Sequence, residues 1–249
     1  MRAIFAIYKR ELLSSFASPM GYVLLASFLV FNGVVFSFFM QMVASNPALS
    51  GTRGPLQMFF GSTILSVLTL LIFCPAISMR TFAEERRART FETLFTTTVT
   101  ETEVVLGKFF GALTVWMTLW LPTLLYALVV RRYGPVDWGV LASAYLGQCV
   151  IGGAFLSLGI LMSALSRSQV TAFVLSFLAT GGVMFALGLG SYIYTDESRL
   201  QFFGYVNLWS HLENFSVGLV DTRALVYYLS VTALGLGLTV NVLAGRKEA

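Results

Sequence analysis

The chain alternates long, uncharged, mostly apolar runs with short segments that carry nearly all of its charge. The six runs are residues 14–52, 54–79, 109–130, 138–166, 168–195 and 224–245. A helix needs about 20 apolar residues to cross a bilayer, because each residue adds about 1.5 Å. Every run is long enough for one span. The pattern predicts an all-α integral membrane protein with six transmembrane helices in one transmembrane domain, residues 1–249.

Composition supports this class. Hydrophobic residues make up 57% of the chain and charged residues 11%, whereas soluble domains carry about a quarter charged residues. A soluble, all-helical core is a weak alternative, because buried helices seldom reach this length without a polar stripe.

The basic residues indicate an orientation. If both termini are cytoplasmic, eleven of the 16 Lys and Arg residues lie inside. The five outside would be Arg53, Arg131, Arg132, Arg199 and Arg223. This asymmetry follows the positive-inside rule, so the net charge of +4 needs no nucleic-acid partner.

The first sixteen residues are amphipathic. One sector of a helical wheel holds the apolar side chains of Ile4, Phe5, Tyr8, Leu12 and Phe16. The opposite sector holds the cations Arg2, Lys9 and Arg10. A basic amphipathic helix is typical of a membrane interface. Pro19 and Gly21 then favour a sharp turn into the first span.

Other features concern the helices and their connections. Pro75 and Pro122 interrupt the second and third spans. Small residues in the fourth and fifth runs favour close packing, either within the chain or at a dimer interface. Residues 196–223 are too apolar for disorder and too interrupted to span, which predicts short half-helices on the outer face. Candidate residues for an outer partner surface there are His211, Glu213, Asn214, Asp221 and Arg223.

Several chemistries find no support in the sequence. The six runs contain no ionisable residue, although intramembrane charge usually marks ion and proton pathways. The chain has no GxxxxGK[ST] phosphate loop, no metal-ligand spacing and no evident catalytic pair. Cys74 and Cys149 fall within spans as packing residues. If the protein moves anything uphill, the energy must come from a partner.

The most charged stretch lies between the second and third spans, "MRTFAEERRARTFETLFTTTVTETEVVLGK". Glu84 with Arg87 and Glu85 with Arg89 have the spacing of ion pairs on a helix. An apolar face follows, and Thr100 with Glu103 has the form of a capping box. A solvated loop would need neither feature. A short amphipathic helix of this kind suits docking into a groove on another protein.

This stretch resembles the cytoplasmic signature of type-2 ABC exporter permeases. The matching residues are Glu84, Glu85, Thr90, Glu92, Leu94, Gly107 and Lys108. Arg89 stands where the family often has Gly, and Thr98 where it often has Pro. Segments such as "SPMGY", "PTLLY" and "HLENFSVGLVDTRALVYYLS" are most similar to the gliding-motility-type permease branch.

The resemblance implies a multi-pass subunit of a bacterial inner membrane, surrounded by lipids and paired with a second permease, either a copy or a relative. Two cytoplasmic ABC ATPase subunits would bind ATP and Mg, so the permease itself would hold no cofactor and catalyse nothing. The segment between spans two and three would be the coupling helix. Its contact residues would be Glu84, Glu85, Arg86, Arg87, Arg89, Thr90, Phe91, Glu92, Leu94 and Phe95.

Three functions stay open at this point. The first is export of a substrate driven by the ATPase, in a gliding-motility-type system or another. The second is an ATP-driven mechanical subunit that acts on a periplasmic partner without moving a substrate. The third is an ATP-independent membrane scaffold, against which the resemblance argues. None of the residues identifies the cargo.

Overall fold

The computed structural model describes residues 2–45, 54–87, 100–193 and 203–247. Throughout these ranges the regular structure is helical, without strands. The helices are α1 (Arg2–Ala17), α2 (Pro19–Ser45), α4 (Pro55–Phe60), α5 (Ile64–Ser78), α6 (Arg80–Arg87), α8 (Glu101–Trp120), the 3-10 turn η1 (Leu121–Thr123), α9 (Leu124–Arg131), α10 (Trp138–Leu165), α11 (Gln169–Ile193), α13 (Leu208–Ser216) and α14 (Thr222–Lys247).

The prediction of six membrane-spanning helices is confirmed. Those long and apolar enough are Pro19–Ser45, Ile64–Glu84, Glu101–Arg131, Trp138–Leu165, Gln169–Leu189 and Thr222–Gly245. The second, third and sixth extend beyond their uncharged runs. As a result the third helix includes Lys108, which the run beginning at residue 109 had excluded. The expectation that the spans lack ionisable residues is therefore wrong, because the second and sixth also include Arg80 and Arg223.

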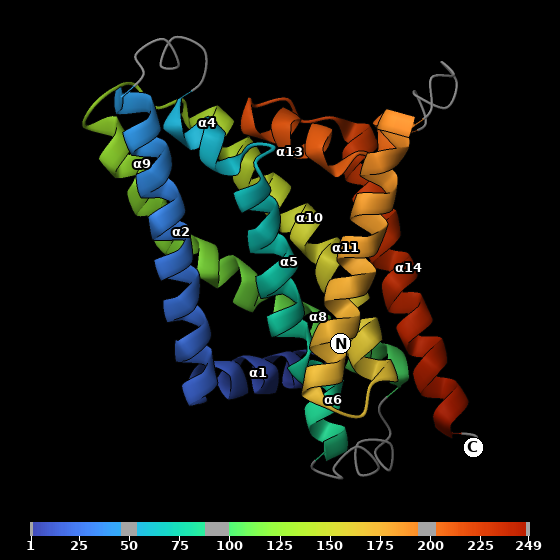
Figure 1. Cartoon of the computed structure of the whole chain (residues 1–249). Helices are drawn as coiled ribbons and strands as arrows, with labels where there is room; N and C mark the ends of the chain where they lie inside the picture. The colour runs from blue at the N-terminus through green and yellow to red at the C-terminus, as the bar shows by residue number, and fades with distance from the viewer. Residues whose placement is uncertain (1, 46–53, 88–99, 194–202, 248–249) are drawn as a thin grey trace.

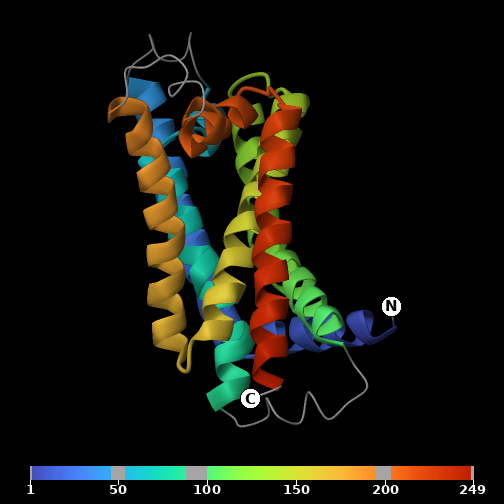
Figure 2. The same ribbon diagram turned by 90° about the vertical axis from the view of Figure 1, so that its right-hand side faces the viewer.

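The spans form a bundle around α10, which packs against α5, α8, α11 and α14 (Figures 1 and 2). One end of the bundle carries α1, α6 and the last turns of α14, and is called the termini end below. At the opposite end, called the far end, α4 and α13 lie across the bundle (Figure 1). Helix α13 agrees with the predicted half-helix between the fifth and sixth spans.

The amphipathic first helix is also confirmed. Helix α1 ends at Ala17 and lies across the end of the bundle, whereas α2 begins at Pro19 and runs along the bundle (Figure 1). Ser18 stabilises the turn, since its hydroxyl accepts from Gly21 N at 3.2 Å. The apolar sector of α1 is divided between two environments, however. Phe5 is 65% exposed, whereas the side toward Ile7 packs on α8.

The second apolar run holds more than one helix. Residues 55–60 form the separate helix α4, and the non-helical residues Gly61 to Thr63 separate it from α5. Thr63 caps α5 by accepting from Ser66 N at 3.3 Å. Pro75 lies inside α5, and Pro122 lies in η1, which interrupts the third span between α8 and α9. The predicted proline interruptions are thus present, whereas the extra helix was missed.

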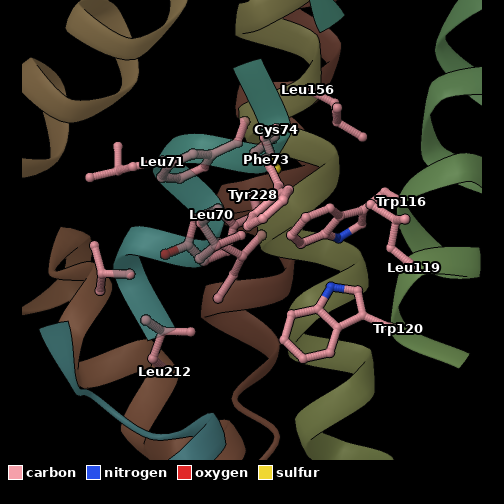
Figure 3. Packing of buried hydrophobic residues seen from close by; sticks show 14 of the residues in the cluster. Leu70, Leu71, Phe73, Cys74, Trp116, Leu119, Trp120, Leu156, Leu212 and Tyr228 are labelled. Atoms are coloured by element: carbon pink, nitrogen blue, oxygen red, sulfur yellow. The ribbon is translucent and has the colours of Figure 1, made fainter. Parts of the chain in front are cut away.

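Aromatic residues dominate the core between α2, α5, α8 and α10. Phe28 is fully buried and makes edge-to-face contacts with Phe73, Trp116 and Trp120. Figure 3 shows Trp116 and Trp120 together with Phe73 among the buried hydrophobic residues. A Cβ on Gly152 of α10 would collide with the indole of Trp116, whose Nε1 donates to Gln148 O at 2.9 Å. The small residues of the fourth run therefore serve packing within the chain.

Candidate functional site

Lys108 connects three helices at the termini end. Its ammonium donates to Glu11 Oε1 of α1 at 2.7 Å and to Thr81 O of α6 at 2.7 Å. It also lies 5.0 Å from the centre of the Phe82 ring. The side chain is 1% exposed. A buried ammonium is costly unless it is paired and hydrogen-bonded, so both partners are required to hold it there.

Close packing of α1 on α8 brings Glu11 to Lys108. A Cβ on Gly107 would lie 2.9 Å from Ile7 Cβ, and one on Gly111 would lie 2.9 Å from Glu11 Cβ. These distances are too short for real side chains, so α1 can approach α8 this closely only because both positions are glycine. Tyr8 adds a hydrogen bond of 3.2 Å between its hydroxyl and Thr114. The GxxxG spacing lets α1 lie against α8.

The turn from α5 into α6 is held by Ser163 of α10. Its hydroxyl accepts from Phe82 N at 3.1 Å and Ala83 N at 3.2 Å, and donates to Met79 O at 3.1 Å. The first N–H groups of any helix lack partners within the helix. Ser163, which is fully buried, supplies the acceptor from another helix. This ties α6 to the centre of the bundle.

Arg80 makes a second link at this junction. Its Nε donates to Glu84 Oε2 at 3.1 Å, and its Nη1 donates to Ser18 Oγ at 3.2 Å, in the turn between α1 and α2. Glu84, one of the predicted contact residues, is thus paired with Arg80. A crevice of about 70 Å³ is lined by both ion pairs, Arg80–Glu84 and Lys108–Glu11.

Most of the predicted coupling residues cannot be placed. Arg89, Thr90, Phe91, Glu92, Leu94 and Phe95 lie outside the described residues, as do the side chains of Glu85, Arg86 and Arg87. The flanks are described: α6 precedes this segment and α8 follows it. Thr100 Oγ1 accepts from Glu103 N at 3.4 Å, and Glu103 Oε2 accepts from Thr100 N at 3.3 Å. The predicted capping box is confirmed.

At the far end, α13 is fastened to two neighbours. Glu213 Oε2 accepts from Ser62 Oγ at 2.6 Å and from Ser62 N at 3.3 Å, between α4 and α5. His211 is buried, and its Nδ1 lies 3.0 Å from the hydroxyl of Tyr228 in α14. His211 therefore faces the bundle and supports α13 from within.

The remaining candidates at the far end lie nearer the surface. Asn214 is half-buried, and its carbonyl accepts from Leu219 N at 2.8 Å. Asp221 and Arg223 are exposed at the start of α14. The Arg223 guanidinium donates to Tyr205 Oη at 3.2 Å. The five candidates thus divide between inward supports and an exposed edge.

Desolvation lowers the pKa of His211 below its usual value of 6.5. Asp221 and a hydrogen bond to the Tyr205 backbone act in the opposite direction and offset part of the shift. Burial disfavours the charged imidazolium, so His211 is neutral at pH 7.

The contacts of Lys108, Ser163 and Arg80 together form a junction between α1, α6, α8 and α10 at the termini end. Sequence reasoning missed Glu11 and Ser163 in this junction, and it missed that Lys108 is buried. Lys108 was noticed only as part of a motif. A lone glutamate within a basic amphipathic helix is the one signal that pointed to Glu11. Ser163 gave none, because its partners are backbone groups of another helix.

The fold and the junction define a class: a multi-pass helical membrane protein with an interfacial helix locked to its second and third spans. The model of the ABC-2 family transporter proteins matches residues 41–212, more than half of the chain. The chain belongs to this family. None of the curated proteins compared with it matches. Membrane domains of the family are generally non-catalytic transmembrane subunits that work with an ABC ATPase.

Proposed function

We propose that this chain is the permease subunit of an ABC exporter in a bacterial inner membrane, with its termini end in the cytoplasm. Residues 84–95 serve as the coupling helix that docks on a separate ATPase subunit. The complex has two permease subunits and two ATPase subunits, so each permease docks on one ATPase. ATP and Mg bind the ATPase. That the exporter belongs to a gliding-motility-type system stays a prediction, which rests on the resemblance in sequence.

The observation that carries the proposal is the three-helix contact of Lys108. The segment between α6 and α8 is flanked by Thr81 on one side and Lys108 on the other, and these two groups are joined directly. Any displacement imposed on the segment therefore reaches both flanks together. Glu11 passes it to α1, and Ser163 passes it to α10. Such a junction suits the conversion of an ATPase movement into a movement of spans.

Co-purification with the ATPase encoded beside the gene tests the proposal. We expect a detergent-stable complex whose ATP hydrolysis rate depends on the permease. A Phe91→Ala, Leu94→Ala double variant should lose the complex or the stimulation, because apolar anchors dominate docking. Arg167→Ala, at the exposed turn between α10 and α11, is the matched control and should behave as wild type. A chain that neither binds nor alters the ATPase would overturn the proposal.

A mechanical subunit without cargo is the second candidate. The turn between α13 and α14 exposes Leu219 by 63% and Val220 by 46%, beside the exposed Asp221 and Arg223. Exposed apolar residues next to charges fit a protein partner. If this function holds, Leu219→Glu should abolish the cellular activity. Inverted vesicles should show no ATP-dependent transport with either the wild type or the variant. Transport of a substrate by wild-type vesicles would exclude it.

A further inference from the structure

A large cavity lies at the far end of the bundle, away from the junction. Its volume is about 870 Å³, and α2, α4, the chain after α9 and the first turns of α10 enclose it. The lining is mainly apolar, with Met40, Val43, Leu56, Phe60, Leu141 and Ala144 among its residues. Ligand pockets in proteins have volumes of about 300–1,000 Å³, so the cavity can accept a sizeable apolar group.

Two arginines adjoin lining residues of this cavity in the sequence, although neither lines the cavity itself. Arg131 ends α9 and Arg132 follows it, directly before the lining residues Tyr133 and Gly134. Both are exposed, and among the described residues neither makes an ion pair with a carboxylate. The Arg131 guanidinium lies 5.9 Å from the Trp138 ring. These two cations are also exceptions to the basic asymmetry of the chain.

The lining includes one carboxylate, Asp137, which is engaged in capping α10. Its Oδ1 accepts from Gly139 N at 2.8 Å and Val140 N at 3.3 Å, and so caps α10. The exposed aromatic rings of Tyr133 and Trp138 are typical of the membrane–water interface. The cavity therefore combines an apolar interior, an interfacial rim and two adjoining arginines that make no ion pair with a carboxylate of the described residues.

We propose that the cavity holds an acyl chain of one phospholipid from the leaflet at the far end, with the phosphate bound by Arg131 and Arg132. An acyl chain has no polar group and suits the apolar lining. Arginine binds phosphate oxygens through paired hydrogen bonds. A protein segment would bring an N–H and a C=O group at nearly every residue, each of which requires a partner, whereas the mainly apolar lining offers only a few polar side chains, such as Gln41, Gln57 and Ser216. The lipid is a resident of the fold, independent of any cargo and of the ATPase.

Native mass spectrometry of the delipidated full chain tests this proposal. Phosphatidylglycerol should bind with one molecule clearly tighter than the rest. Each arginine at a membrane surface contributes about fivefold in affinity, so Arg131→Gln with Arg132→Gln should weaken this binding roughly 20-fold. Arg223→Gln removes an exposed arginine of the same end that does not adjoin the lining residues in the sequence, and should change nothing. Diacylglycerol, which lacks the phosphate, should bind wild type and the double variant equally weakly.

The acyl site needs its own variant. Ala44 lines the cavity from an exposed position on α2, so Ala44→Trp should fill the space without disturbing the core. It should reduce binding at least tenfold. Ala26→Trp, also exposed on α2 but outside the cavity, is the matched control. Equal binding by both tryptophan variants, or equal binding of phosphatidylglycerol by wild type and the arginine double variant, would overturn the proposal. Size-exclusion profiles confirm that each variant is folded.

Discussion

Lys108 Nζ lies 2.7 Å from Glu11 Oε1, which joins residues 97 positions apart in the sequence. Glu11 is 21% exposed and Lys108 only 1%, so the pair lies at the edge of the core with the ammonium on the inner side. This contact fixes the interfacial helix α1 to the third span.

Removal of the lysine charge should destabilise the protein and uncouple it. In Lys108→Met, Glu11 and the Thr81 carbonyl lose their donor. Breaking a fully buried ion pair costs about 3–5 kcal/mol of stability. We expect a smaller loss here, because Glu11 keeps some contact with water. The thermal midpoint in detergent measures this. Lys9→Met removes an exposed lysine of α1 and should have no such effect.

The corresponding double variant separates stability from coupling. Replacing both members of a buried pair by apolar residues often restores stability, so Lys108→Met with Glu11→Met should regain most of the thermal midpoint. Stimulation of the partner ATPase should stay reduced, because the link between α1, α6 and α8 is still missing. Full recovery of both properties would show that the pair serves stability alone.

Ser163 should matter more than other buried serines. In Ser163→Ala, the N–H groups of Phe82 and Ala83 lose their acceptor, which costs about 1–3 kcal/mol for a buried unsatisfied group. Ser157→Ala is the control, since Ser157 donates only to Ala154 O within its own helix. Its thermal midpoint should stay close to wild type. Similar losses in the two variants would contradict the role of Ser163 at the α5–α6 turn.

Two glycines should respond with opposite signs to the same substitution. Gly107→Ala places a Cβ against Ile7 and should destabilise by about 1–3 kcal/mol through overpacking. Gly182 of α11 has open space around it, so Gly182→Ala should stabilise by about 0.4–1 kcal/mol through reduced freedom of the unfolded chain. Thermal midpoints of the two variants, measured side by side, check the contact between α1 and α8.

Local patterns explain which parts of the fold could be predicted. Uncharged runs located the spans, Pro19 located the break before α2, and the Thr100–Glu103 spacing located the start of α8. Each signal acts within a few residues of the feature it marks. Helix α4 was missed because its apolar residues continue into α5, and only the Gly61–Thr63 turn separates the two.

The junction depended on contacts that no local pattern contains. Helical periodicity gives the faces of α1 and α8 but not the partner of either face. Lys108 borders an apolar run, so the charge pattern placed it in a cytoplasmic segment outside the spans. In the fold it is buried, because Glu11 and the Thr81 carbonyl offset the cost of removing its ammonium from water. Ser163 bonds to backbone atoms, which are the same for any residue, so its role depends on the fold alone.

Acid should weaken the far end of the bundle through His211. Its pKa is lowered in the folded protein, so the unfolded chain binds the proton more readily. Stability is therefore unaffected above the unfolded value of about 6.5 and falls as the pH drops from there toward the folded pKa. Asp221 is the nearby charge that opposes this shift, and Tyr228 and Tyr205 are the hydrogen-bonding neighbours. Thermal midpoints at pH 7.5 and 5.0 measure the loss, and His211→Gln should reduce the difference between them. An unchanged difference in this variant would assign the acid sensitivity to other groups.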